Sequence, residues 1–159
     1  MRRKQAGFSL IELLIVVAII LIIAAIAIPS LIQSKMTANE ASAVQTLRDV
    51  NTAESIYMIQ FGNGYSPDLK SLGGTSGVAT ASSAQLIPDP VAVTGTKDGF
   101  TFIYAVTGNN GVGGTPSNYS VNGNPTTPST TGRRWFYTDE TLVIRQNASS
   151  PSTSADPSI

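Results

Sequence analysis

Residues 7–20 read Gly7-Phe8-Ser9-Leu10-Ile11-Glu12-Leu13-Leu14-Ile15-Val16-Val17-Ala18-Ile19-Ile20, and this stretch decides the fold. From Leu13 to Ile28 every residue is Leu, Ile, Val or Ala. As a helix, the 21 residues from Phe8 to Ile28 reach about 32 Å at about 1.5 Å per residue. This length matches the hydrocarbon core of a bilayer, about 30 Å thick. The sequence therefore predicts a membrane-spanning helix over residues 8–29.

Three cations, Arg2, Arg3 and Lys4, precede this stretch. Lys and Arg are in excess on the cytoplasmic side of membrane helices, so we expect a cytoplasmic N-terminus with the rest of the chain outside. The same order of features, with small residues at Ala25-Ile26-Ala27, also fits an ordinary secretory signal. Two features favour the spanning helix: the apolar run is longer than a typical signal core, and Glu12 lies at its start.

Glu12 places a carboxylate inside the predicted membrane helix. Such a group costs up to about 3 kcal/mol on insertion scales. Each of the twelve Leu, Ile or Val residues between Leu13 and Ile28 contributes about −0.3 to −0.6 kcal/mol, so insertion is still favoured. Glu12 is then either an acid tolerated near the headgroups or a carboxylate held for a cationic partner. A newly exposed chain terminus could supply that cation if the chain were cut close to Glu12.

The order of these residues resembles the N-terminal signature of type IV prepilins and type II secretion pseudopilins. The shared features are a basic leader, Gly7, Phe8, a Glu four positions later at Glu12, and an uninterrupted apolar helix. The resemblance implies that a prepilin peptidase removes residues 1–7 by cutting between Gly7 and Phe8, and that the new Phe8 amine is methylated. It also implies that Glu12 pairs with the terminal amine of a neighbouring subunit, and a charged pair in a dry setting helps to fix register.

The resemblance further implies partners and a location. The expected partners are other pilin subunits in a homopolymer, the prepilin peptidase and methyltransferase, the inner-membrane assembly platform with its ATPase, and membrane lipid before assembly. We expect a single-pass precursor in the bacterial inner membrane and, after assembly, a pilus or a periplasmic pseudopilus. The chain has no run such as Asp-Pro-Trp-Gly-Asn-Pro, familiar from major pseudopilins, so a structural subunit of a type IV pilus is favoured. The alternatives are a major pseudopilin of type II secretion and a secreted binding module with a conventional signal peptide.

Pro29 closes the apolar run. Inside a helix, Pro removes the hydrogen bond to the carbonyl four residues earlier, so Pro29 marks either a boundary or a helix that continues with a kink or weak point. In similar pilins, a Pro at the corresponding place marks such a weak point, which implies a role for Pro29 in assembly.

Helical periodicity resumes after Pro29 and predicts an amphipathic second half of the helix over residues 30–62. Polar residues such as Glu40 are expected away from the buried face, and Gly62 begins a clear stop signal. Residues 12–61 are thus predicted to form one long helix. The apolar face is expected at Met36, Ala43, Leu47, Val50, Ala53, Tyr57 and Phe61.

The remaining residues predict a small head at 63–147 and a mobile Ser-, Pro- and Thr-rich tail at 148–159. Residues 64–98 are interpreted as a connecting region with a short helix near 67–72. Trp135, Phe136 and Tyr137 are expected to supply core contacts. The fold class is α+β, in which the long N-terminal helix packs on an antiparallel sheet of three or four strands. Strand patterns occur at Phe100–Val106, Tyr119–Val121, Arg134–Thr138 and Leu142–Arg145.

The chain contains no Cys and no His, and its formal net charge is zero. Thiol chemistry, disulfides and zinc sites of the usual kind are therefore excluded, and no stretch pairs a nucleophile with a base, so we expect no enzyme and no cofactor. The charge balance gives no reason to expect direct binding of nucleic acid. Asp139 and Glu140 are weak candidates for a calcium site, although a polar turn is favoured. Asn118 and Asn147 begin weak glycosylation patterns.

Overall fold

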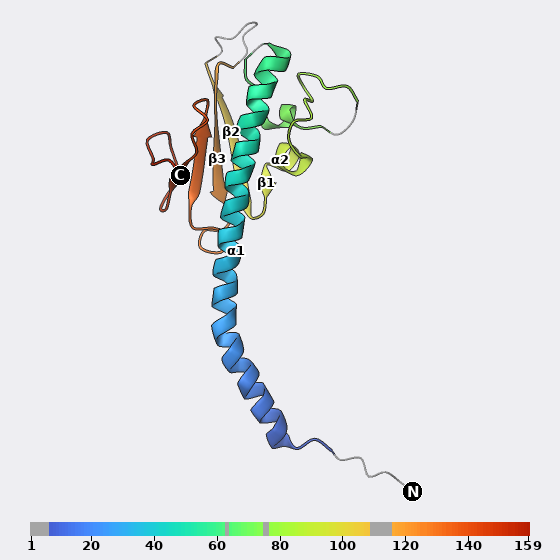
Figure 1. Cartoon of the computed structure of the whole chain (residues 1–159), viewed down its shortest axis with the longest axis vertical. Helices are drawn as coiled ribbons and strands as arrows, with labels where there is room; N and C mark the ends of the chain where they lie inside the picture. The colour runs from blue at the N-terminus through green and yellow to red at the C-terminus, as the bar shows by residue number, and fades with distance from the viewer. Residues whose placement is uncertain (1–6, 63, 75–76, 109–115) are drawn as a thin grey trace. The chain divides into compact units, whose positions relative to one another are not determined.

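The computed structural model describes residues 7–62, 64–74, 77–108 and 116–159. It confirms the predicted α+β class, with one long helix and an antiparallel sheet (Figure 1). The predicted leader residues 1–6 lie outside the described residues. The elements are α1 (Leu10–Phe61), η1 (Leu69–Leu72), α2 (Asp89–Thr94), β1 (Thr96–Lys97), β2 (Phe100–Thr107), β3 (Asn118–Pro125), β4 (Trp135–Asp139) and β5 (Arg145–Asn147).

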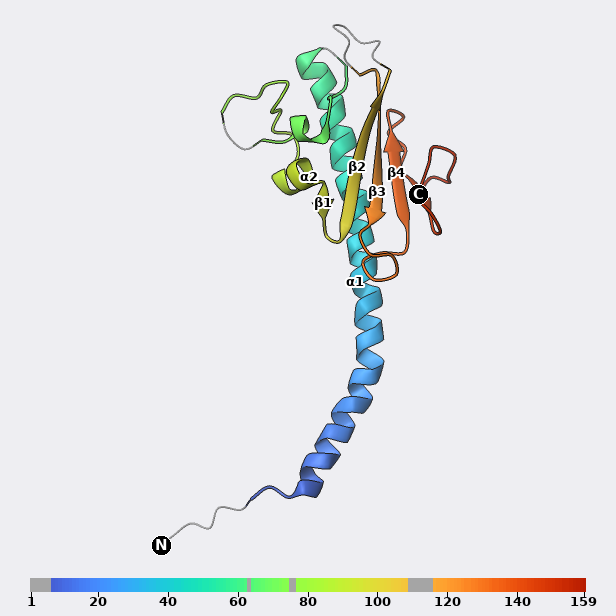
Figure 2. The same ribbon diagram turned by 180° about the vertical axis from the view of Figure 1, so that it is seen from behind.

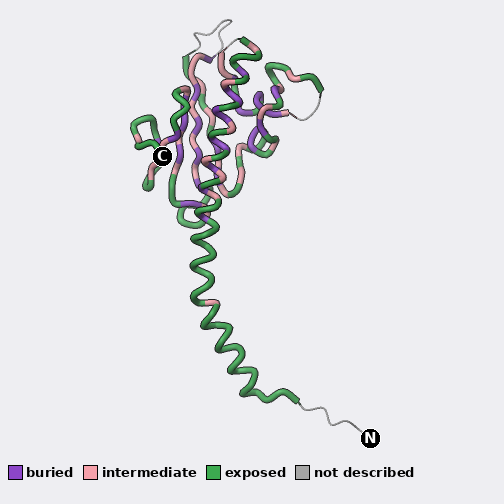
Figure 3. Tube along the Cα trace, viewed as in Figure 1, coloured by how far each residue is buried: buried purple, intermediate pink, exposed green. Residues whose placement is uncertain are grey.

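The chain divides into two compact units, Met1–Lys35 and Met36–Ile159. In the first unit, almost every described side chain is exposed, although most are apolar (Figure 3). Among the described helices, α1 is long and apolar enough to cross a membrane, judged by its length and composition. No residue in its most apolar 18-residue window is buried by other parts of the chain.

The helix α1 continues through Pro29 rather than ending there. The prediction of one long helix is therefore confirmed, and Pro29 is not a helix boundary. Because Pro has no backbone N–H, the Ala25 carbonyl lacks its usual partner in this turn. The part that Pro29 plays in assembly stays a prediction.

The second unit contains a five-stranded antiparallel sheet in the order β1-β2-β3-β4-β5, so each strand pairs with its neighbour in sequence. The sheet has five strands where three or four were expected, because the two-residue strand β1 adds an edge that the sequence did not predict. The first short strand enters β2 through the Asp98-Gly99 turn, in which both residues have positive φ. An Asp-Gly pair favours this kind of hairpin turn.

The strand expected at Leu142–Arg145 is displaced along the chain. The structure places β5 at Arg145–Asn147, because residues after Asp139 form a turn instead. The Leu142 N–H donates to the Asp139 carbonyl at 2.9 Å, which closes that turn. Because of this turn, the next strand begins at Arg145, after most of the apolar residues on which the prediction rested.

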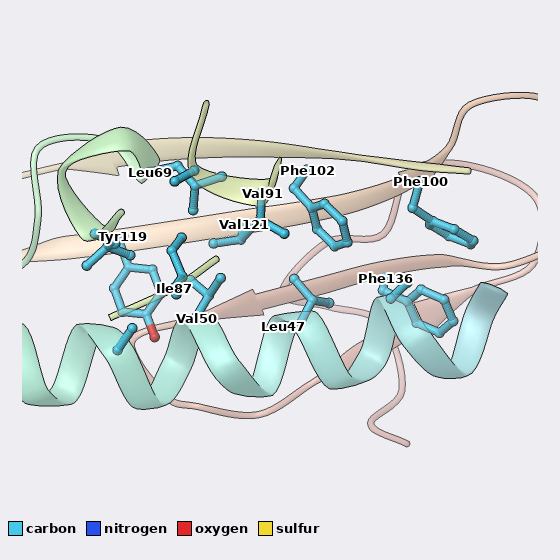
Figure 4. Close-up of a cluster of buried hydrophobic side chains, with 14 of the residues drawn as sticks. Leu47, Val50, Leu69, Ile87, Val91, Phe100, Phe102, Tyr119, Val121 and Phe136 are labelled. Atoms are coloured by element: carbon cyan, nitrogen blue, oxygen red, sulfur yellow. The ribbon is translucent and has the colours of Figure 1, made fainter. Parts of the chain in front are cut away.

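The core of the second unit lies between residues 36–61 of α1 and one face of the sheet (Figures 2 and 4). Leu47 and Val50 on the helix face Phe102 and Val121 on the sheet (Figure 4). The predicted helix face is confirmed: six of its seven positions are buried, and Phe61 packs against the core while partly exposed. The six are Met36, Ala43, Leu47, Val50, Ala53 and Tyr57.

The prediction that Trp135, Phe136 and Tyr137 all supply core contacts is only partly correct. Side chains of a strand alternate between its two faces, so Phe136 is fully buried whereas Trp135 and Tyr137 are half-buried on the other face. The ring centroid of Phe136 lies 5.9 Å from that of Phe100. A Cβ atom at Gly132 would lie 2.5 Å from Cζ of Phe100, so a larger residue at this position would displace the buried Phe100 ring.

The region interpreted as a connection contains more structure than expected. The predicted short helix is present as η1, where the Asp68 carboxylate accepts a hydrogen bond from the Ser71 N–H at 2.7 Å. The helix α2 was not predicted. Pro90 lies in its first turn, a position that proline favours, and Gly95 ends it with a positive φ.

Residues 148–159, expected to form a mobile tail, make specific contacts with the sheet. Asn122 Nδ2 donates to the carbonyl oxygen of Ser152, which is buried, at 2.7 Å. The Gln146 N–H donates to the Pro157 carbonyl at 3.0 Å, so this segment extends the hydrogen bonding beyond β5. These contacts argue against a tail that is detached from the head.

Candidate functional site

The N-terminal segment brings together the residues at which processing and assembly are expected. Gly7 and Phe8 precede α1, and the Phe8 side chain is 82% exposed. A Cβ atom at Gly7 would meet nothing within 4 Å, so the bond after Gly7 is not covered by the described parts of the chain. Glu12 lies in the first turn of the helix and is also exposed. The bond that the sequence predicts to be cut is therefore open to another protein.

The helix begins with a capping arrangement that our sequence analysis missed. The Ser9 N–H donates to Oε2 of Glu12 at 2.9 Å, and the Leu13 N–H donates to the Ser9 carbonyl at 3.3 Å. Ser9 is thus the N-cap, and Glu12, at the third helical position, reaches back to satisfy its N–H. The pattern Ser-x-x-Glu before an apolar run is the sequence signal for this arrangement. Glu12 therefore has a structural role before any subunit partner is considered.

From Leu13 to Ile28, α1 presents an apolar surface on all sides rather than a single stripe. A helix that is apolar all round must be buried, either in lipid or among other helices. This surface can therefore serve as a membrane anchor, or as a packing surface for sister helices. The large apolar residues exposed from the start of the helix to just beyond Pro29 are Leu10, Ile11, Leu13, Leu14, Ile15, Val16, Val17, Ile19, Ile20, Leu21, Ile22, Ile23, Ile26, Ile28, Leu31 and Ile32.

The candidates for calcium binding form a hydrogen-bonded turn. Asp139 Oδ1 accepts from the Thr141 N–H at 3.0 Å, and Glu140 Oε1 accepts from Asn118 Nδ2 at 3.1 Å. In the part of the chain that the structure describes, no three Asp or Glu side chains lie close enough to hold a metal ion. Both carboxylates thus accept hydrogen bonds within the fold, and a calcium role for them stays a prediction.

A helix whose apolar first half is exposed, preceded by the exposed residues Gly7 and Phe8 and followed by a small α+β head, is the arrangement expected of type IV prepilins. Comparison with known families agrees: residues 2–28 match the prokaryotic N-terminal methylation motif. The chain is also 44% identical over 57 residues to the type IV wide pilus major component PilA4 of Thermus thermophilus. Both findings are similarities to part of the chain, and they agree with the resemblance to type IV prepilins noted in its sequence.

The similarity to this relative is partial. The aligned residues make up 36% of this chain and 44% of the relative's own length. No solved structure was found to match the chain. The motif match bears on the N-terminal segment, and the similarity to PilA4 covers only part of either chain.

Proposed function

We propose that this protein is the structural subunit of a type IV pilus. In this proposal, a prepilin peptidase cuts between Gly7 and Phe8 and the new Phe8 amine is methylated. The subunit then waits in the inner membrane as a single-pass protein and is extracted by an assembly platform driven by an ATPase. Subunits polymerise through α1, whose apolar side chains leave lipid and pack against those of sister helices.

One observation carries this proposal: residues 2–28 match the methylation motif, and the described part of the chain buries no residue in the most apolar window of the helix that begins there. The similarity to a major component of a type IV pilus favours a pilus over other filaments. Glu12 supplies the charge expected to fix register, because it can pair with the amine of a neighbouring Phe8. Removal of residues 1–7 also removes three of the ten cations, which leaves seven cations against ten acids before the termini are counted.

Mass spectrometry of the N-terminus of the mature protein tests the processing step. We expect a chain that starts at Phe8 and carries one methyl group on its amine, because the motif and the open Gly7–Phe8 bond favour this cut. A chain that starts at Ile28 would contradict the proposal, since it would show an ordinary secretory signal cut after Ala27. That cut would also fall within α1, which is continuous from Leu10 to Phe61.

The alternative assembly, a pseudopilus of type II secretion, uses the same processing. Sheared surface filaments that contain this chain distinguish the two, because a pseudopilus remains in the periplasm. We expect the chain in the sheared surface fraction of wild-type cells. If it is found in periplasmic assemblies alone, the pilus assignment is wrong while the processing step stands.

A further inference from the structure

The head contains a buried acid that the proposed assembly does not use. Glu54 lies on the part of α1 that packs on the sheet, and its side chain is fully buried. In the described residues, the one ion pair between a Lys or Arg and a carboxylate is that of Arg134 with Glu40, so Glu54 has no cationic partner. A buried carboxylate without a counter-ion is costly, and such groups tend to become neutral. Glu54 therefore requires an explanation.

The surroundings of Glu54 consist of hydroxyl and backbone groups from two other parts of the head. The Ser66 N–H donates to Glu54 Oε2 at 2.9 Å. The other carboxyl oxygen, Oε1, lies 2.6 Å from Ser66 Oγ and 2.6 Å from Tyr104 Oη. Ser66 belongs to the loop that follows α1, and Tyr104 belongs to β2. The carboxyl group thus joins the helix, the loop and the sheet.

The two hydroxyl groups have further acceptors within reach. Tyr104 Oη lies 2.9 Å from the Ser66 carbonyl oxygen, and Ser66 Oγ lies 3.1 Å from the Asp68 carbonyl oxygen. Each hydroxyl carries a single hydrogen, so two hydrogens must serve Glu54 Oε1 and both carbonyl oxygens. If Glu54 is ionised, both hydrogens go to Oε1 and neither carbonyl receives one. A proton on Oε1 supplies the third hydrogen and releases one hydroxyl to a carbonyl.

We propose that the folded head holds Glu54 as its neutral acid, and that ionisation of this buried carboxyl loosens the junction between α1, the loop at Ser66 and strand β2. The head then has a built-in response to pH, in which the junction is firm when Glu54 is protonated. This inference concerns the second unit alone and does not depend on the proposed function.

Among the described residues, no Lys or Arg forms an ion pair with Glu54 that would favour its ionised form. Burial raises the pKa of Glu54 above its ordinary value of 4.5, although the hydrogen bonds from Ser66 and Tyr104 lower it in part. Burial also raises the pKa of Tyr104, and the nearby Glu54 adds to that shift. The titratable groups that face this region are Tyr57 on α1, Tyr65 and Asp68 in and after the loop, Tyr104 on β2 and Tyr119 on β3.

The raised pKa of Glu54 determines how the stability of the head changes with pH. The folded head binds the Glu54 proton more tightly than the unfolded chain does, so the stabilisation is complete below pH 4.5. It is lost as the pH rises from there through the raised pKa of the folded state. Above that pKa, the folded head carries an ionised buried carboxyl and is less stable.

The variant Glu54→Gln tests the proposal, since Gln is a permanently neutral mimic of the acid. Its amide oxygen can accept from the Ser66 N–H, and its amide nitrogen can donate to both hydroxyls. We expect the thermal midpoint of the wild-type head to fall between pH 4.5 and about pH 8, and that of the variant to fall less. Both proteins are measured as full chains in detergent micelles, by near-ultraviolet circular dichroism. Equal pH dependence in the two proteins would overturn the proposal.

A direct titration of the wild type covers the case in which the variant does not fold. The chemical shift of the Glu54 carboxyl carbon in ¹³C-labelled full chain reports its protonation. We expect a midpoint above 4.5, and an upward movement of that midpoint in Tyr104→Phe, because the ionised form loses one donor. A midpoint at or below 4.5 in the wild type would show that Glu54 is held ionised and would refute the inference.

Discussion

Replacing Glu12 by alanine is expected to leave processing and membrane insertion intact while reducing filament assembly on the order of a hundredfold or more. Loss of one partner from a desolvated charge pair costs about 3–5 kcal/mol, which is the expected penalty when the amine of a neighbouring Phe8 is left unpaired. Insertion itself becomes more favourable, because the carboxylate is the costly group in the apolar helix. The measurements are the amount of mature chain in membranes, the methylation of Phe8, and the amount of chain in sheared filaments. Normal filaments from Glu12→Ala would show that the pair does not set the register.

The capping contact of Glu12 requires a matched control. Because Glu12 also accepts the Ser9 N–H, alanine removes a helix cap along with the charge, and a lost cap alone costs roughly 1 kcal/mol. Glu12→Gln keeps an oxygen that can accept from Ser9, since Gln serves at this position of a capping box, but carries no charge. We expect Glu12→Gln to assemble as poorly as Glu12→Ala. Assembly restored by Gln would mean that capping, and not charge pairing, is the role of this residue.

The long helix could be predicted from the sequence because two strong local signals agree along it. The run from Leu13 to Ile28 is apolar without a break, and periodic apolar positions from Met36 to Tyr57 mark one face. Both signals depend on residues close in sequence, so no knowledge of the head is needed. The capping pair Ser9 and Glu12 was equally local, and reading the Ser-x-x-Glu pattern would have found it.

The buried acids of α1 could not be predicted in this way. Glu40 was expected on the exposed side of the helix, yet its carboxylate is buried and pairs with Arg134 at 2.8 Å. It also accepts from the Arg133 N–H at 2.7 Å, so it ties the helix to the loop before β4. These partners lie more than 90 residues along the chain. From the sequence alone, an acidic residue on a helix is predicted to be exposed. Only the folded structure shows that a distant residue such as Arg134 is close enough to pair with it.

The burial of Glu54 could not be predicted from the sequence either, because its partners come from the loop after α1 and from β2. The sequence shows a Glu among good helix formers and gives no sign that a Ser and a Tyr will enclose it.

The displacement of the last strand, β5, has another cause. Leu142 and its neighbours have strand propensity, but the turn closed at Asp139 overrides it.

Replacing Phe136 by alanine is expected to destabilise the head by about 3–5 kcal/mol, because it removes a fully buried ring and leaves a cavity. A domain of this size is stable by only about 5–15 kcal/mol, so the loss is a large share of the total. The ring lies 5.9 Å from that of Phe100, and the Arg134 guanidinium lies 5.8 Å from its centroid, so neighbours on two sides lose a partner. The measurement is chemical unfolding of the full chain in detergent, followed by the fluorescence of Trp135, the single Trp of the sequence.

The neighbouring residue on the same strand is the matched control. Tyr137 is similar in size to Phe136 but points to the opposite, half-buried face, so its removal leaves no enclosed cavity. We expect Tyr137→Ala to cost less than about half of what Phe136→Ala costs, because partly exposed side chains lose less transfer free energy. Equal losses from the two variants would contradict the alternation of faces along β4, and with it the placement of α1 on the Phe136 side of the sheet.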